Sequence, residues 1–134
     1  MALYSKKNNK IWILKAVDRK TRKCIAHAVG QRDAETVYKL YEKLKHLNAI
    51  FYTDSWSAFL EVLPKERHII GKKHTITIEQ NNSNTRHHLG RMTRRTKVVS
   101  KTKEMVDLSI KLWIHVNESN EFNRLRNIFL KSIF

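Results

Sequence analysis

Residues 11–17 read IWILKAV and residues 23–29 read KCIAHAV, and these two runs decide the fold. The first run is almost continuously apolar, which is typical of a strand in a sheet covered on both faces. Residues 18–22, DRKTR, join the two runs, and so short a connection favours an antiparallel pair. The sequence therefore predicts a central hairpin with helices packed against it.

Helical and strand patterns alternate along the rest of the chain. Asp33 is a good N-cap, and apolar residues at three- and four-residue spacing up to Leu47 predict an amphipathic helix after it. We expect short strands over 49–52 and 68–70, a short helix over 56–63 between them, and then helices over 76–92, 105–116 and 122–129. This order predicts an α/β fold with a mixed sheet flanked by helices, and a ribonuclease H-like core fits it.

Length, charge and cysteine content narrow the class of protein. The chain has 134 residues, the size of one domain. Lys and Arg number 27 against 12 Asp and Glu, and the resulting net charge of +15 makes nucleic acid the leading partner. A single cysteine, Cys24, suits a reducing compartment, and we expect it to be buried. The apolar runs are too short for a membrane span, so we expect a soluble intracellular protein.

One tract concentrates the positive charge. No acidic residue lies between Glu79 and Glu104, while seven basic residues do: Arg86, Arg91, Arg94, Arg95, Lys97, Lys101 and Lys103. A run of charge often marks only a solvated helix face, but this run in so basic a chain favours contact with backbone phosphates. The candidate DNA-binding residues are Arg86, Arg91, Arg94, Arg95 and Lys97.

Two carboxylates occupy positions that suit phosphoryl-transfer chemistry. Asp54 follows a predicted strand, and Glu79 lies in the first turn of a helix if that helix starts near Thr75. Hard divalent cations such as Mg²⁺ prefer rigidly held oxygen ligands of this kind. From the pattern alone, a structural explanation stays open for both, as an N-cap for Asp54 and as a complement to the helix dipole for Glu79.

Three segments together resemble a known family. KKNNKIWILKAVDRKTRKCIAHAVGQR, FYTDSWSAF and IEQNNSNTRHHLGRMTRRTKVVSKT are similar, in order and spacing, to the catalytic region of insertion-sequence-1 family transposases, and the match runs from about Ser5 to about Val116. The resemblance implies a ribonuclease H-like DDE catalytic domain over residues 1–116 and a C-terminal helical extension over 117–134.

The resemblance also assigns roles to single residues. Asp54 within YTDSW matches the second aspartate of the family's Asp, Asp, Glu triad, and Glu79 matches the glutamate, with 24 residues between them. Arg86, two helical turns beyond Glu79, matches the basic position that commonly follows the glutamate. The implied cofactor is Mg²⁺ or Mn²⁺, held by Asp54 and Glu79, for hydrolysis and strand transfer at DNA.

One position departs from the family pattern. The family's first aspartate opens the first strand, and its expected place here falls just before Met1, so we expect the first strand to be incomplete. Asp18 is better explained as a turn residue than as a substitute. Two carboxylates can still bind magnesium weakly, but the loss of one ligand of a two-metal site is expected to remove most strand-transfer activity.

Three functions therefore stay open. The first is a DDE-type transposase domain that recombines an insertion sequence, here as a truncated or inactive copy. The second is a non-enzymatic basic DNA-binding module, or a dominant-negative partner of a full-length transposase. The third is a basic structural protein of a ribonucleoprotein particle. For the first two we expect double-stranded DNA of transposon ends and target as partner, a homo-oligomer or a complex with full-length transposase, and a bacterial cytoplasmic location on the nucleoid.

Overall fold

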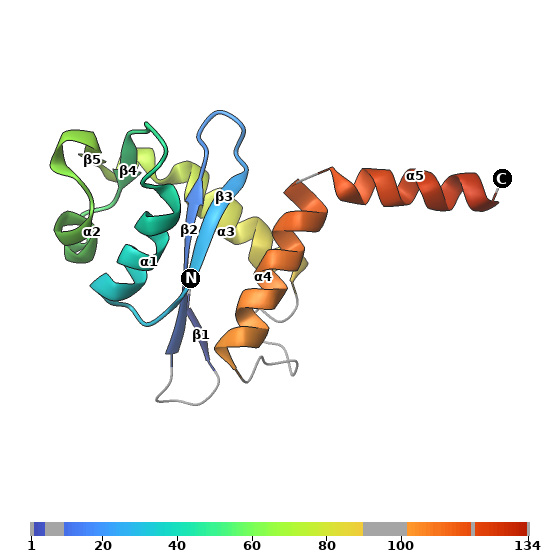
Figure 1. The fold of residues 1–134 in the computed structure, drawn as a ribbon, viewed down its shortest axis with the longest axis horizontal. Coiled ribbons are helices and arrows are strands. Elements are labelled where there is room, and N and C mark those ends of the chain that lie inside the picture. Colours follow the sequence, from blue (N-terminus) through green and yellow to red (C-terminus); the bar gives the residue numbers. More distant parts are fainter. Residues whose placement is uncertain (1, 5–9, 90–101, 119, 134) are drawn as a thin grey trace.

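Helices pack on both sides of a central hairpin (Figure 1). The structure, a computed structural model, describes residues 2–4, 10–89, 102–118 and 120–133. The strands are β1 (Ala2–Tyr4), β2 (Lys10–Val17), β3 (Cys24–Gly30), β4 (Phe51–Thr53) and β5 (His68–Ile70). The helices are α1 (Ala34–Leu44), α2 (Ser57–Val62), α3 (Ile76–His88), α4 (Lys103–Glu118) and α5 (Glu121–Ile133), with two short 3-10 helices, η1 (Lys65–Arg67) and η2 (Lys72–His74).

The predicted hairpin is confirmed as the antiparallel pair β2 and β3, in which Lys15 lies opposite His27. Asp18 closes the turn, because its carboxylate accepts hydrogen bonds from Thr21 Oγ1 at 2.8 Å and from Lys20 N at 3.1 Å. These bonds, that from Thr21 first, lower the pKa of Asp18. The interpretation of Asp18 as a turn residue is therefore confirmed.

Helix α1 covers one face of the hairpin through apolar contacts. Asp33 caps it as predicted, with Oδ1 accepting from Thr36 N at 2.9 Å. Leu40 and Leu44 are buried in a cluster that includes Ala28 of β3, and burial of each leucine contributes roughly 1.5–3 kcal/mol. The helix ends at Leu44, earlier than expected, because a turn follows it, but Leu47 still packs against this cluster.

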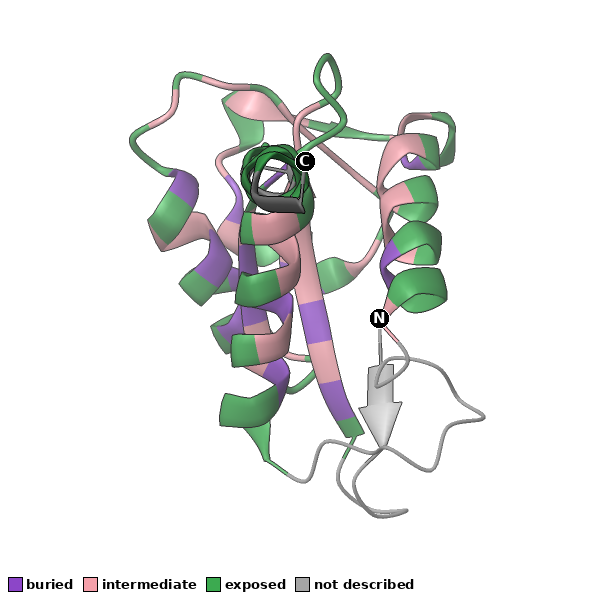
Figure 2. Cartoon of the chain, turned by 90° about the vertical axis from the view of Figure 1, so that its right-hand side faces the viewer, coloured by how far each residue is buried: buried purple, intermediate pink, exposed green. Residues whose placement is uncertain are grey.

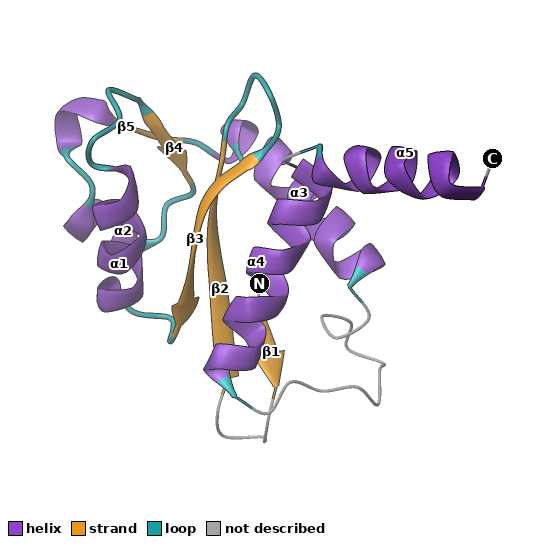
Figure 3. Cartoon of the chain, turned by 45° about the vertical axis from the view of Figure 1, so that its right-hand side comes forward, coloured by secondary structure: helices purple, strands orange, loops and turns teal. Residues whose placement is uncertain are grey.

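Helix α4 covers the opposite face. Side chains alternate across a strand, so Ile11 and Ile13 of β2 point away from α1, and both are buried against Val106 and Ile110 of α4. Figure 3 shows the hairpin between α1 on one side and α4 on the other. The expectation that helices cover both faces is therefore confirmed.

The strands do not form the single mixed sheet that the sequence analysis predicted. β1, β2 and β3 form an antiparallel sheet in that order, and β4 pairs in parallel with β5 as a separate two-stranded sheet. β1 and β4 each have three residues, so each offers little backbone for pairing between the sheets. The α/β class is confirmed, and the correction is that the described strands form two small sheets.

The two last helices are present where apolar stripes predicted them, and each is longer than its stripe. α5 extends away from the sheets (Figure 1), and its described side chains are exposed (Figure 2). Cys24 is buried, as expected. Over the described residues, no helix has the length and apolar character needed to cross a membrane.

Candidate metal and nucleic-acid site

Asp54 directly follows β4, where the sequence places it. Its side chain is exposed, and Oδ1 accepts a hydrogen bond from Trp56 N at 3.1 Å. The preceding residue is firmly held, because Thr53 Oγ1 donates to Asp54 O at 2.8 Å and lies 2.6 Å from His68 Nε2. A carboxylate offers about four lone-pair sites, so the bond to Trp56 leaves Asp54 capacity to bind a cation.

Glu79 lies in the first turn of α3, as expected. Its side chain is exposed, and its backbone N donates to Thr75 O at 3.0 Å. Thr75 Oγ1 donates to Lys72 O at 2.8 Å and lies 3.1 Å from Glu79 Oε1. The start of the helix therefore holds one carboxylate oxygen of Glu79, while the side chain as a whole stays exposed.

The two carboxylates follow the same edge of the parallel strand pair. Thr53, which ends β4, pairs with Ile70, which ends β5, and Gly71 N donates to Thr53 O at 3.0 Å. From Gly71 the chain runs through η2 into α3. Asp54 thus directly follows β4, and Glu79 lies at the start of the helix that follows β5 through η2, so the predicted strand end and helix start are confirmed.

Arg86 is exposed on α3, and its spacing from Glu79 puts both residues on one face of the helix. The adjoining side of the helix, about 100° around the axis, is buried: Thr85 is fully inaccessible to solvent. The other candidate DNA-binding residues lie outside the described residues; they are Arg91, Arg94, Arg95 and Lys97. The helix predicted over 76–92 is described up to Leu89. In that part, α3 ends at His88 rather than continuing towards Met92.

A second group of positive charges lies beside β4 and was missed by the sequence analysis. The guanidinium of Arg19, in the hairpin turn, is 4.3 Å from the centre of the Tyr52 ring, and Tyr52 in turn contacts the ring of His74 in η2. Burial lowers the pKa of His74, and the charges of Lys73 and Arg19 lower it further. Turn residues 18–22 looked like a simple connection, and only the tertiary structure shows that they reach the edge that carries Asp54.

Arg32 makes a comparable contact with the segment that follows Asp54. Its guanidinium lies 5.2 Å from the Trp56 ring and 5.0 Å from the Trp12 ring. Cation–π contacts of this kind hold an arginine in place with its polar edge available to solvent. Arg32 therefore connects the segment after Asp54 to β2 and adds a positive charge beside Trp56.

Lys15 connects β2 to the helix that carries Glu79. Its Nζ donates to Asn81 Oδ1 at 2.8 Å and also to Thr85 Oγ1. Asn81 Nδ2 also reaches Arg22 O in the hairpin turn, at 3.4 Å. An ammonium group in an otherwise apolar strand looked like a simple interruption of the pattern, but it fixes the rotation of α3 about its axis.

The described residues fit a divalent cation in chemistry but supply few ligands. Asp54 and Glu79 provide the hard oxygen donors that Mg²⁺ and Mn²⁺ prefer. No group of three or more His, Cys, Asp or Glu side chains in the described part of the chain could hold a metal ion. Asp18, committed to its turn, is not a third ligand.

The chain is thus a strongly basic α/β domain with two exposed carboxylates on segments that follow a parallel strand pair. The sequence comparison identifies the family: the chain matches the family model of the IS1 transposase over residues 2–120, and it belongs to that family.

The curated relatives are proteins of insertion elements in enteric bacteria. The insertion element IS1 protein InsB of Shigella flexneri is 32% identical over 111 residues, which cover 82% of this chain and 85% of the relative. The insertion element IS1 2 protein InsB of Escherichia coli strain K12 is 31% identical over the same length, and the match covers 66% of it. No solved structure matches this chain.

Proposed function

We propose that this chain is a DDE-type transposase catalytic domain on a ribonuclease H-like core, acting on double-stranded DNA at transposon ends and target. The observation that carries the proposal is that Asp54 and Glu79 both emerge from the carboxyl edge of the β4 and β5 pair. The order of the elements supports the core assignment: an antiparallel meander, a helix, then a parallel strand pair that leads into α3.

Asp54 and Glu79 are the residues that would hold Mg²⁺ or Mn²⁺. When bound, such an ion activates water as a nucleophile and neutralises charge on the leaving oxygen. The protein's own contribution is placement: the bond from Trp56 N orients Asp54, and the bonds of Lys15 to α3 orient the helix that carries Glu79.

The basic residues around these carboxylates would hold the DNA backbone. Arg86 shares the exposed face of Glu79, and Arg19, Lys72 and Lys73 lie on the hairpin turn and on η2. Contacts of lysine and arginine with phosphates position a duplex without reading its sequence. We therefore expect binding that is strong, salt-sensitive and largely independent of base sequence.

The test separates the metal site from the DNA surface. Asp54→Asn and Glu79→Gln should each weaken Mn²⁺ binding at least roughly tenfold, measured by calorimetry or by electron paramagnetic resonance. Duplex affinity in the absence of metal should stay unchanged or improve, because each substitution removes a negative charge that repels phosphate. Glu61→Gln, an exposed carboxylate on α2, is the matched control and should change neither property. Unchanged Mn²⁺ binding in both site variants would refute the metal assignment.

A second pair of variants tests the DNA surface. Arg86→Ala should lower duplex affinity and reduce the slope of log K against log salt by about one. Lys65→Ala, an exposed lysine on η1, is the control and should leave the slope unchanged. Equal slopes for wild type and Arg86→Ala would remove this residue from the interface.

One observation favours the alternative of a non-enzymatic DNA-binding module: the described residues bring no third metal ligand to the two carboxylates. A plasmid-nicking assay with Mg²⁺ or Mn²⁺ distinguishes the two functions. Nicking that Asp54→Asn abolishes supports the enzyme, whereas tight DNA binding without nicking supports the binding module.

A further inference from the structure

Arg32 is an exposed cation whose backbone is fixed on both sides. Trp12 of β2 lies opposite Gly30, the last residue of β3, and Arg32 follows two residues later. The next residue, Asp33, accepts a hydrogen bond from Thr36 N at 2.9 Å and thereby caps α1. The side chain of Arg32 therefore starts from a short connection between a strand end and a helix start.

Two indole rings from distant parts of the chain hold the guanidinium of Arg32. Its Cζ lies 5.0 Å from the centre of the Trp12 ring and 5.2 Å from the centre of the Trp56 ring. Trp56 is itself supported, because the Phe59 ring contacts it edge-to-face at a centroid distance of 5.1 Å and Phe59 N donates to Trp56 O at 3.0 Å. Such ring contacts restrain an arginine while its N–H groups stay able to donate.

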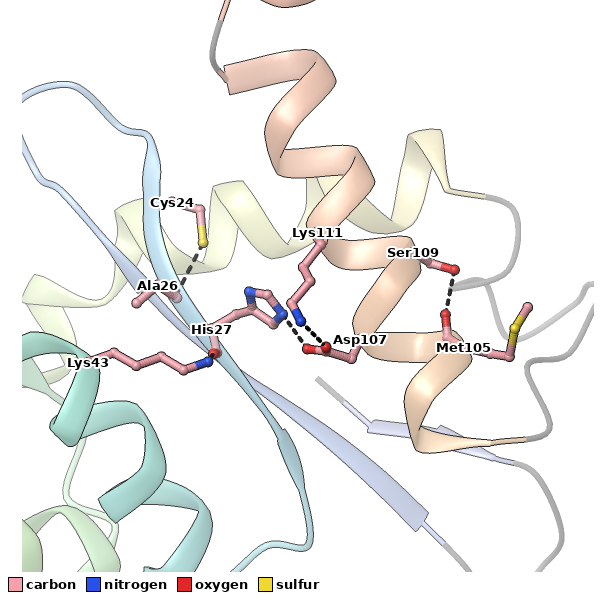
Figure 4. Close-up of polar contacts among 8 residues, drawn as sticks. All are labelled: Cys24, Ala26, His27, Lys43, Met105, Asp107, Ser109 and Lys111. Carbon is pink, nitrogen blue, oxygen red and sulfur yellow. Dashed lines mark hydrogen bonds and ion pairs between the residues drawn. The ribbon is translucent and has the colours of Figure 1, made fainter.

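The N–H groups of Arg32 are not used within the described part of the chain. Arg32 makes no hydrogen bond or ion pair with another described residue. Other cations beside the hairpin do: Lys43 donates to His27 O and Lys111 bonds Asp107, both at 2.6 Å (Figure 4). The donors of Arg32 are therefore available to a group other than the described residues.

Arg67 is chemically matched to Arg32 and shows the contrast most directly. Its guanidinium also contacts an aromatic ring, that of Phe51, at 5.9 Å. However, Arg67 Nη1 donates to Leu47 O at 3.0 Å, so this arginine connects two segments of its own chain. A ring contact alone thus does not distinguish a structural arginine from a binding one, whereas the use of its donors does.

Arg32 lies close to the candidate metal ligand Asp54. Trp56, which Arg32 contacts, is two residues beyond Asp54, and two residues span at most about 7 Å. Trp56 N donates to Asp54 Oδ1 at 3.1 Å, so Trp56 orients the carboxylate through its backbone and supports the guanidinium through its ring. A DNA strand carries one phosphate per roughly 3.4 Å of helix axis. A strand bound at Asp54 would therefore bring a neighbouring phosphate within reach of Arg32.

A phosphate fits this arrangement better than a nucleotide base does. A guanidinium presents its donors in a planar fork that matches two phosphate oxygens. A base would need an uncovered ring for stacking, whereas the Trp56 ring is half-buried and already contacts Arg32 and Phe59. In a chain with a net charge of +15, a polyanion is also the partner that the overall charge favours.

We propose that Arg32, held by the rings of Trp12 and Trp56, binds a backbone phosphate of the DNA strand that lies at Asp54. The assignment rests on the proposed function, because it takes that strand to be the one that is cleaved. It adds to the DNA surface a residue outside both α3 and the basic tract between Glu79 and Glu104. Because two rings fix the direction of the guanidinium, the contact orients the strand as well as attracting it.

The first experiment measures duplex affinity by fluorescence anisotropy over a range of salt, without metal. Arg32→Ala should lower the affinity about tenfold, because a charge-assisted hydrogen bond is lost. It should also reduce the slope of log K against log salt by about one. Arg67→Ala is the matched control and should leave the slope unchanged, because Leu47 O already uses that guanidinium. An unchanged slope in Arg32→Ala, or an equal change in both variants, would overturn the proposal.

Arg32→Lys separates the planar fork from simple charge. It keeps the positive charge, so the salt slope should equal that of wild type. It lacks the fork and its fit to the indole rings, so only part of the affinity lost in Arg32→Ala should return. Full recovery of affinity in Arg32→Lys would contradict the role of the rings.

The role of Trp56 is tested by a double-mutant cycle. Trp56→Leu removes the ring but keeps the backbone N that donates to Asp54. It should weaken DNA binding, and Arg32→Ala combined with Trp56→Leu should lose no more affinity than Arg32→Ala alone, because the ring acts through the guanidinium. Additive losses would show that Trp56 contacts DNA independently, as a base-stacking ring would, and would contradict the proposal.

The position of the strand is tested with a chemical probe. Cys24 is buried, so an iron chelate can be attached to a new cysteine at the exposed Ser55, beside Asp54. At saturating protein, Ser55→Cys should cleave bound DNA, and adding Arg32→Ala should reduce this cleavage several-fold, because the strand is no longer oriented. The same probe at Glu61→Cys, on α2, is the control and should not respond to Arg32→Ala. Cleavage from position 55 that is unchanged by Arg32→Ala would place the contact elsewhere and refute the proposal.

Mn²⁺ binding distinguishes this proposal from the metal assignment. Without DNA, Arg32→Ala should bind Mn²⁺ at least as tightly as wild type, because Arg32 bonds neither Asp54 nor Glu79 and its charge repels the ion. Weaker Mn²⁺ binding in this variant would mean that Arg32 supports the carboxylates instead, and would overturn the phosphate assignment. If Asp54→Asn and Glu79→Gln leave Mn²⁺ binding unchanged while the slope of Arg32→Ala falls, the metal assignment fails and the phosphate contact stands.

Discussion

The two faces of the β2 and β3 hairpin differ in the polar contacts that hold their helices. On the α1 face, Leu40 and Leu44 pack against Ala28 and other apolar residues, and Lys43 of α1 donates to a backbone atom, His27 O, at 2.6 Å. On the α3 and α4 face, apolar packing is joined by two directional contacts, from Lys15 to α3 and from His27 to α4. Apolar packing fixes how close a helix lies, whereas hydrogen bonds also fix how it is rotated and where it sits along its axis.

The difference has a functional consequence. α3 carries Glu79 and Arg86, whereas α1 carries no candidate metal ligand or DNA-binding residue of the proposed function. The face covered by α3 and α4 is thus the face where an error in helix orientation would misplace a candidate site.

The largest loss of stability is expected on the apolar face. Leu40→Ala should lower the free energy of unfolding by about 2–5 kcal/mol, because the buried side chain leaves a cavity between α1 and the sheet. Urea denaturation measures this directly. Leu60→Ala makes the same chemical change at a site that is 45% exposed and should have a much smaller effect. Similar losses for the two variants would show that α1 is not packed as described.

A smaller loss of stability but a larger loss of function is expected on the polar face. Lys15→Met keeps the length of the side chain but leaves Asn81 Oδ1 without this donor, which should lower stability by about 1–3 kcal/mol. Thr85 keeps its bond to Asn81 O at 2.9 Å, so the helix itself should persist. Because α3 can then rotate, Mn²⁺ affinity should fall several-fold, and calorimetry measures this.

A double-mutant cycle distinguishes this contact from general packing. Lys15→Met and Asn81→Ala should be less than additive, with a coupling energy above about 0.5 kcal/mol, because both remove the same bond. Lys10→Met, on the exposed end of β2, should be additive with Asn81→Ala. Strict additivity in both cycles would show that Lys15 does not position α3.

The sequence predicted the local elements well because local patterns encode them. The apolar run over residues 11–17, the Asp33 cap and the stripe through Leu40 each correspond to an element of the structure within a few residues. Asp54 after β4 and Glu79 in the first turn of α3 were also placed correctly, because each position depends on one strand end or one helix start. Their roles as metal ligands stay predictions.

Contacts between distant segments could not be predicted in the same way. Lys15 and its partners on α3 are 66 and 70 residues apart, and His27 and Asp107 are 80 residues apart. No periodicity in a single sequence pairs such residues. The division into two sheets escaped prediction for the same reason, because hydropathy shows that a strand exists and not which strand it joins.

The smallest expected effect concerns the second polar contact and depends on pH. Burial lowers the pKa of His27 from its ordinary value of 6.5, and this effect outweighs the hydrogen bond and charge of Asp107, which raise it. Burial alone would raise the pKa of Asp107, but hydrogen bonds from Lys111 and His27 outweigh it and lower that pKa below 3.8, so the carboxylate stays ionised above pH 5.

The sign of the effect follows from proton uptake. Below about pH 6.5 the unfolded chain protonates this histidine while the folded protein resists, so stability present at pH 7.5 is lost as the pH falls. His27→Gln cannot take up this proton, and its urea midpoint should therefore fall less than that of wild type between pH 7.5 and pH 5.5. The exposed His46 provides the control, because His46→Gln should keep the wild-type pH dependence. Identical curves for wild type and His27→Gln would mean that the contact between β3 and α4 forms equally well with a charged ring, and that the polar face is less sensitive to pH than its burial implies.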